Sequence, residues 1–118
     1  MIFGDTGWRD ITSIDPNVVI TSGKIYVRFL NGMITIRLDA VVTTAKEIKL
    51  SLGSGWSMAT NAYPAMILGN NLNRYVTLAW DGNHTIRSTE TATSLTYTGH
   101  VTFMARNTYP SSLPGIPG

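Results

Sequence analysis

Apolar and polar residues alternate most regularly between Lys24 and Ala40, on either side of Asn31-Gly32. This dipeptide suits a two-residue type I′ turn, in which both central residues take positive φ angles. The alternation therefore predicts an antiparallel hairpin with one apolar face and one mostly polar face. The expected apolar pairs are Phe29 with Ile34, Val27 with Ile36 and Ile25 with Leu38, and the expected pairs on the other face are Leu30 with Met33, Arg28 with Thr35, Tyr26 with Arg37 and Lys24 with Asp39.

A second hairpin is predicted around Asp81-Gly82-Asn83. A two-residue loop would place Leu78 opposite Thr85, whereas a three-residue loop places Leu78 opposite Ile86. We expect the three-residue loop, because it pairs two apolar residues. It implies a type I turn with Asn83 near the left-handed region and an adjacent bulge.

The remaining strand-like segments are short and are separated by residues typical of turns. Strands are predicted at 47–52, 65–68 and 95–105, and a loop is predicted at 53–64, which is rich in Gly, Ser and Asn. Alternate residues of the longest of these strands should point inward. Gly99 falls on that inward side, where glycine is typical of a bulge or a close backbone contact.

About eight short strands of this kind predict an all-β fold, either an antiparallel β-sandwich or a jelly-roll-like barrel. The 118 residues suit a single domain that spans 1–118, because a chain of this size buries roughly two-thirds of its unfolded surface. Three of the five prolines lie near the end of the chain, and proline lacks the N–H group that a sheet ladder requires. We therefore expect 107–118 to form an extended Pro-rich tail outside the middle of a sheet.

Charge and composition argue against several classes of function. The nine basic residues are scattered and give a net charge of only +2, whereas nucleic-acid binding favours a basic patch. We also expect no membrane insertion, since no apolar run approaches the ~20 residues of a membrane span. The chain contains no cysteine, which excludes disulfides and thiolate chemistry.

Catalytic and metal-binding patterns are weak, so the sequence predicts neither an enzyme nor a cofactor. The seven carboxylates stand in no recognised catalytic setting, although a spatial pair such as Asp10 with Asp81 stays open. His84 and His100 are too few for a zinc site within one chain, although a three-fold axis would multiply one of them. The 81–83 segment holds only part of a calcium loop.

Aromatic residues are the better candidates for ligand binding, because flat sugar rings stack on exposed Trp and Tyr rings. We expect the site where the 53–63 loop approaches the 81–84 turn, with the outward strand face around Tyr75 and Arg28 as the next candidate. Trp56 has a second interpretation, as a plug at the end of the core. The candidate ligand-binding residues are Trp56, Tyr63, Asp81, Asn83 and Tyr75.

The mostly polar face of the first hairpin also carries apolar groups. Tyr26, Leu30 and Met33 lie on it, and exposed apolar residues on a small, charge-poor domain indicate a partner surface. Trp8 is expected to pack against the sheet or to contact another subunit.

Two short motifs frame the chain: Asp5-Thr6-Gly7-Trp8-Arg9-Asp10-Ile11-Thr12 near the start and Tyr109-Pro110-Ser111-Ser112-Leu113-Pro114-Gly115-Ile116-Pro117-Gly118 near the end. This frame resembles the C-terminal receptor-binding head domains of bacteriophage tail fibres and minor tail proteins, especially those of phages of Gram-positive hosts. The resemblance implies a homotrimer in the virion, assembled in the host cytoplasm, that contacts other tail proteins and a host cell-surface saccharide. The family has no fixed binding motif, so no binding residue is carried over.

Two other functions stay open at this point. One is a purely structural virion module for trimerisation or decoration, without a ligand. The other is a carbohydrate-binding module of a secreted enzyme, which would be monomeric. The oligomeric state separates the carbohydrate-binding module from the two virion functions, and an assay of host-cell binding separates those two from each other.

Overall fold

The structure is a computed structural model and describes residues 5–15, 18–44, 48–52, 56, 65–68, 75–80, 85–88, 96–105 and 113–118. Within these ranges the chain forms nine strands and no helix, so the predicted all-β class is confirmed. None of the described segments is a helix of the length and apolarity that a membrane crossing needs. The strands are β1 (Arg9–Asp10), β2 (Ile20–Leu30), β3 (Met33–Thr43), β4 (Lys49–Ser51), β5 (Ala65–Leu68), β6 (Tyr75–Trp80), β7 (Thr85–Ser88), β8 (Tyr97–Met104) and β9 (Ile116–Pro117).

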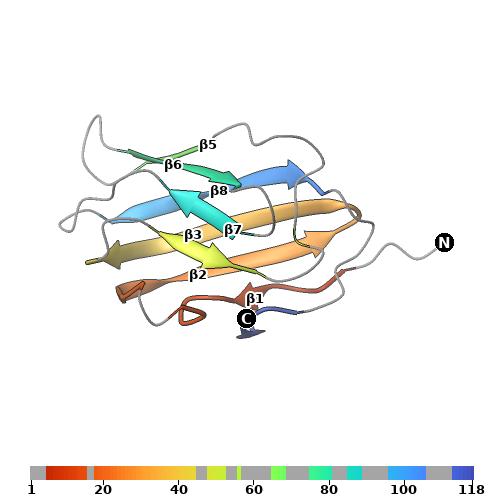
Figure 1. The fold of residues 1–118 in the computed structure, drawn as a ribbon, viewed down its shortest axis with the longest axis horizontal. Helices are drawn as coiled ribbons and strands as arrows, with labels where there is room; N and C mark the ends of the chain where they lie inside the picture. Colours follow the sequence, from red (N-terminus) through yellow and green to blue (C-terminus); the bar gives the residue numbers. More distant parts are fainter. Residues whose placement is uncertain are drawn as a thin grey trace.

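These strands form two antiparallel sheets. The larger sheet has five strands in the order β8-β3-β2-β1-β9, and the smaller has four in the order β4-β7-β6-β5. Figure 1 shows the smaller sheet lying over the larger one. The result is the sandwich-like arrangement that the short alternating strands predict.

The long β2–β3 hairpin has the predicted register throughout the segment from Lys24 to Asp39. Asn31 and Gly32 have φ angles of 51° and 77°, as a type I′ turn requires. Every inward residue of this segment is at most 1% exposed. The hairpin therefore forms as its local pattern dictates, and its apolar face is one wall of the core.

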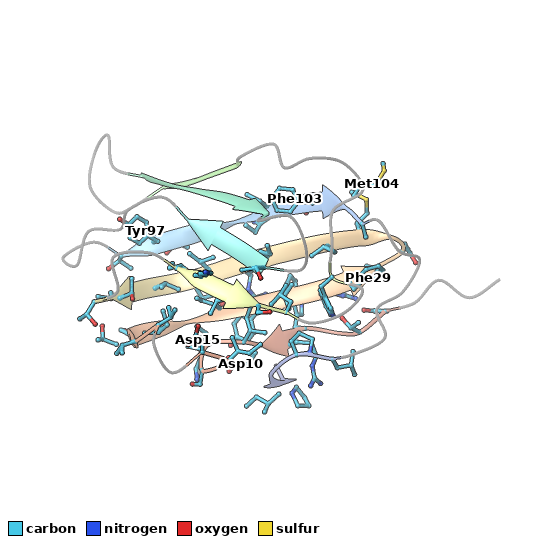
Figure 2. The ribbon with its side chains drawn as sticks, in the orientation of Figure 1. Asp10, Asp15, Phe29, Tyr97, Phe103 and Met104 are labelled. Carbon is cyan, nitrogen blue, oxygen red and sulfur yellow. The ribbon has the colours of Figure 1, made fainter. Side chains whose placement is uncertain are left out.

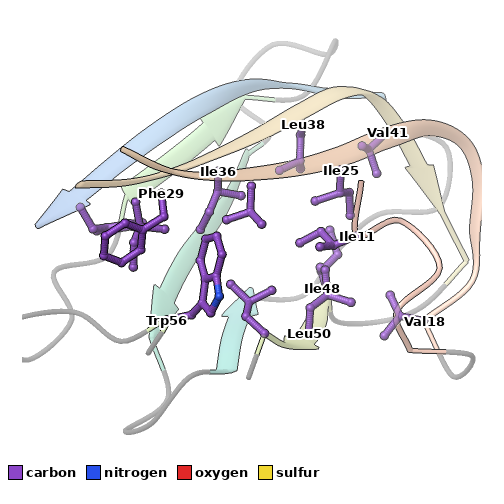
Figure 3. Packing of buried hydrophobic residues seen from close by; sticks show 14 of the residues in the cluster. Ile11, Val18, Ile25, Phe29, Ile36, Leu38, Val41, Ile48, Leu50 and Trp56 are labelled. Carbon is purple, nitrogen blue, oxygen red and sulfur yellow. The ribbon is translucent and has the colours of Figure 1, made fainter. Parts of the chain in front are cut away.

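The opposite wall of the core includes residues that follow the hairpin in the sequence. Leu50 of β4 faces the large sheet, as does Ile48, which immediately precedes that strand. Trp56 lies beside them (Figure 3). The Trp56 ring meets Phe29 edge to face, with centroids 5.6 Å apart and an interplanar angle of 88°. This geometry is one that aromatic pairs prefer.

Strand β8 confirms the predicted alternation and the expected irregularity near Gly99. Tyr97 and Phe103 are buried, whereas His100 is exposed. Gly99 pairs with Leu38, and the register between β3 and β8 shifts immediately after this pair. The extra residue belongs to β3, where Ala40 takes a φ angle of 50°, so the bulge lies on the partner strand.

The predicted register of the second hairpin is wrong by two residues. Leu78 lies opposite Ser88, not Ile86, and Ile86 lies opposite Trp80. A two-residue shift keeps every position on the same side of the sheet, so hydrophobic alternation cannot distinguish the two registers. The expected turn at 81–84 lies outside the described residues.

Other strand predictions differ mainly at their ends. The strand predicted at 65–68 is observed with those bounds, whereas β4 is shorter than the predicted 47–52. The end of the chain adds a short strand, β9, at the edge of the large sheet. An edge position suits Pro117, because the missing N–H group is not needed by a further strand.

Candidate functional site

The structure brings together few of the predicted ligand-binding residues. Trp56 is fully buried, so its ring has no exposed face on which a sugar could stack, and the plug interpretation describes it. Tyr75 begins β6 opposite Leu68, and its side chain lies outside the described part of the chain. Tyr63, Asp81 and Asn83 also lie outside the described residues, so the predicted loop site stays a prediction.

The described residues whose side chains could bind a ligand or a partner gather on the side of the large sheet that points away from the core. We call this surface the outer face. Its strand positions alternate with the buried ones, and they are half-buried or exposed. They comprise Lys24, Tyr26, Arg28 and Leu30 of β2, Met33, Thr35, Arg37 and Asp39 of β3, and Thr98, His100, Thr102 and Met104 of β8.

Two arginines and two aromatic rings form one cluster on the outer face. The guanidinium carbon of Arg37 lies 4.5 Å from the ring centroids of both Trp8 and Tyr26. The guanidinium carbon of Arg28 lies 5.8 Å from the Trp8 centroid. These distances are within the range of cation–π attraction. We call Trp8, Tyr26, Arg28 and Arg37 the arginine–aromatic cluster.

Pairing between β1 and β2 brings Trp8 to this cluster. Arg9 pairs with Val27, which places the preceding residue, Trp8, beside Arg28. The sequence predicts the Tyr26–Arg37 pair from the hairpin register, but it gives no local signal for the Trp8 contact. The link depends on a two-residue strand that pairs at long range.

A two-pronged ion pair fixes Arg28. Its Nε donates to Asp5 Oδ1 at 3.0 Å, and its Nη2 donates to Asp5 Oδ2 at 2.7 Å. The amide of Gly7 donates to the same carboxylate at 2.8 Å. The hydrogen bonds from Arg28 and then from Gly7 lower the pKa of Asp5 to about 2, and the contact raises the pKa of Arg28.

Two further ion pairs balance charge on this surface. Arg37 Nη2 lies 3.2 Å from Asp39 Oδ2, and Lys24 Nζ lies 3.6 Å from Asp10 Oδ2. Burial acts to raise the pKa of Asp10, but hydrogen bonds from the Thr12 hydroxyl and amide, together with Lys24, outweigh it and lower that pKa. Each cation in these described pairs therefore has an acidic partner within the same chain.

An apolar row lies beside the charged residues at the turn end of the hairpin. Leu30 pairs with Met33, which pairs in turn with Met104 across β2, β3 and β8. Met104 is 65% exposed and Met33 is 36% exposed, and Figure 2 shows Met104 at the end of β8. We call these three residues the methionine row.

The motifs from the two ends of the chain meet at the edge of the same sheet. Arg9 donates from Nε to the carbonyl of Pro114 and from Nη2 to that of Gly115, both at 3.0 Å. The amide of Gly118 donates to the Trp8 carbonyl at 2.8 Å. A Cβ atom on Gly115 would lie 2.0 Å from the Asp10 carbonyl oxygen, so the close approach requires glycine.

The outer face offers hydrogen-bond donors and acceptors, aromatic rings and exposed thioethers, which is the chemistry of a binding surface. Among the described residues, no three His, Asp or Glu side chains gather closely enough to hold a metal ion. Comparison of the chain with protein-family models, with curated proteins and with solved structures finds no significant match. We therefore infer the function from the residues of the chain itself.

Proposed function

We propose that this chain is the receptor-binding head domain of a bacteriophage tail fibre or minor tail protein. In this role it acts in the virion as a homotrimer, contacts other tail proteins and recognises a saccharide on the host cell surface without catalysis. The proposal extends the resemblance of the two terminal motifs.

The observation that carries the proposal is the meeting of these two motifs in space. Trp8 and Arg9 from the first motif bind the backbone of the segment that ends the chain. The described residues of the two motifs are therefore parts of one substructure, built on an antiparallel β-sandwich. A shared structural role explains why both motifs occur in one chain.

The proposed saccharide site is the loop region that contains Tyr63, Asp81 and Asn83. Loops that join the strands of a rigid sandwich are favourable places for recognition. The sheets hold the ends of each loop in place, so the loop sequence can vary without loss of the fold. The buried Trp56 precedes Tyr63 by seven residues in the sequence, and its ring packs against Phe29 in the core.

A binding assay with the full chain tests this proposal. Fluorescently labelled protein is applied to a panel of Gram-positive cells and to immobilised cell-wall polysaccharides. We expect saturable binding to one or a few of them, competed by the purified saccharide. Tyr63→Ala and Asn83→Ala should weaken binding without lowering the melting temperature, whereas Val19→Ala, at an exposed position outside the 53–64 and 81–84 segments of the sequence, should leave both unchanged.

Other outcomes favour the alternative functions. The absence of binding to any cell or polysaccharide, by a chain that assembles into trimers, would favour a structural virion module. Binding to a saccharide by a monomer would favour a carbohydrate-binding module.

A further inference from the structure

We propose that copies of this chain associate through the outer face of the five-stranded sheet. Assembly is part of the proposed function, and in that respect the inference rests on it. The choice of surface comes instead from the residues of the outer face.

The residue composition of the outer face is typical of the core of a protein interface. Trp, Tyr, Arg and Met are enriched in the cores of protein interfaces, and Trp, Tyr and Arg are the commonest residues at positions that dominate binding energy. The arginine–aromatic cluster supplies two arginines, a tryptophan and a tyrosine side by side. The methionine row continues the same surface over β3 and β8.

The methionine row exposes apolar surface that a partner could cover. Met104 and Met33 expose 65% and 36% of their surface on neighbouring strands. The inward residues of the same strands are buried, apart from the half-buried Gly99 and Val101 of β8, so the core does not require apolar side chains at these outward positions. Burial against a partner would remove this apolar surface from water, and flexible thioethers adapt well to such a contact.

The charge on this surface favours a second copy of the chain as the partner. The ion pairs of Arg28 with Asp5, Arg37 with Asp39 and Lys24 with Asp10 leave this group of residues without net charge. Identical surfaces that carry a net charge repel each other when they meet, whereas a neutral surface avoids this cost. A surface shaped for an acidic or basic partner would instead carry an excess of the opposite charge.

Contacts within the chain hold the side chains of the arginine–aromatic cluster in place. Arg28 is held by two hydrogen bonds to Asp5, and Arg37 contacts two rings as well as Asp39. Side chains that are already fixed lose less conformational entropy when a partner binds. This arrangement favours association of the face as it stands.

Light scattering coupled to size-exclusion chromatography tests the inference on the full chain. We expect the parent to have the mass of an oligomer at micromolar concentration. Met33→Glu and Met104→Lys should each reduce the mass to that of one chain, because each buries a charge in the proposed interface. Val19→Lys is the matched control, since Val19 is 50% exposed and precedes β2 at the end of that strand far from the methionine row.

A second measurement uses the absence of cysteine from the chain. Met104→Cys should give disulfide-linked chains under mild oxidation, whereas Val19→Cys should give far fewer. The circular dichroism spectrum of each variant checks its fold. A monomeric parent, or an oligomer that is unchanged by both methionine substitutions and is not cross-linked at position 104, would overturn the inference.

The cell-binding assay separates failure of this inference from failure of the proposed function. A monomeric parent that still binds its saccharide would contradict the assembly surface and leave recognition in place. An oligomer that depends on the methionine row but binds no saccharide would support the surface and contradict receptor binding.

Discussion

The two faces of the β2–β3 hairpin are formed by the same strands but differ in burial and in residue type. On the inner face, every residue between Ile25 and Leu38 that points to the core is almost completely buried. On the outer face, the residues between them are half-buried or exposed and include arginines, an aromatic ring and a methionine. Neighbouring residues in the sequence therefore experience very different environments.

This difference shows which residues the fold requires. The inner face sets the register, because a slip by one residue would exchange all the buried side chains for exposed ones. Exposed ion pairs such as Arg28 with Asp5 contribute little to the stability of a protein. The residue types of the outer face are therefore not dictated by folding, and this is why we propose that copies of the chain associate through them.

The largest effect is expected from the core at the inner face. Trp56→Ala should lower the free energy of unfolding by about 3–5 kcal/mol, because it removes a fully buried ring and leaves a cavity beside Phe29. Denaturant titration measures the loss. Trp8→Ala is the matched control on the outer face and should cost much less. Equal losses at the two tryptophans would contradict the contrast between the faces.

The next effect distinguishes two glycines of the hairpin, both with positive φ. Gly23→Ala should destabilise the protein more than Gly32→Ala, because a Cβ atom at Gly23 would lie 2.2 Å from the Ala40 carbonyl oxygen, whereas Gly32 has open space around it. The shared backbone strain costs roughly 1–3 kcal/mol at either position. Thermal melting of the two variants compares them. If Gly32→Ala were the more harmful, the close approach at the bulge would be in doubt.

A smaller effect is expected within the arginine–aromatic cluster. Arg37→Met keeps an unbranched side chain but removes the charge that interacts with Trp8 and Tyr26, so it should cost about 0.5–1 kcal/mol. Trp8 fluorescence should change with the substitution, because the guanidinium lies 4.5 Å from its ring centroid. Lys49→Met, on the exposed side of β4, is the control and should leave the fluorescence unchanged.

The smallest effect concerns acid stability. The pKa of Asp5 is about 2 in the folded chain and 3.8 in its ordinary state. Its contribution is therefore present above about pH 4 and is lost as the pH falls toward 2. Asp5→Asn should reduce the fall in melting temperature between pH 5 and pH 2 relative to the parent, since asparagine does not titrate. An identical pH profile would contradict the link between the Asp5–Arg28 pair and stability.

The sequence predicts the β2–β3 hairpin between Lys24 and Asp39, because Asn31-Gly32 fixes the turn and alternation fixes the faces. It does not predict the extension of the two strands to Ile20 and Thr43, where the register shifts. It misses the register of the second hairpin, where two alternatives preserve the same alternation. It also leaves open whether Trp56 plugs the core or binds a ligand, since a tryptophan in a Gly-rich loop suits both roles. Only the position of its ring against Phe29 distinguishes them.

The outer face is predictable only in part. The Tyr26–Arg37 pair follows from the hairpin register, and the apolar residues on this face are visible in the sequence. The contact of Trp8 with the arginines requires β1 to pair with β2, and the docking of Gly118 requires β9 to pair with β1. Strands of two residues carry almost no periodic signal, and nothing local specifies pairing between the two ends of a chain.

Two adjacent residues of β3 test the central claim, that one face of the hairpin builds the fold and the other binds a partner. Ile36→Ala should lower the free energy of unfolding by about 2–5 kcal/mol and leave the mass of the folded assembly unchanged. Arg37→Glu should lower it by less than Ile36→Ala does, because Arg37 is only half-buried, and should reduce that mass to one chain. Unfolding is compared at the lowest practical protein concentration, where assembly contributes least. An Arg37→Glu protein that assembles like the parent would contradict the claim.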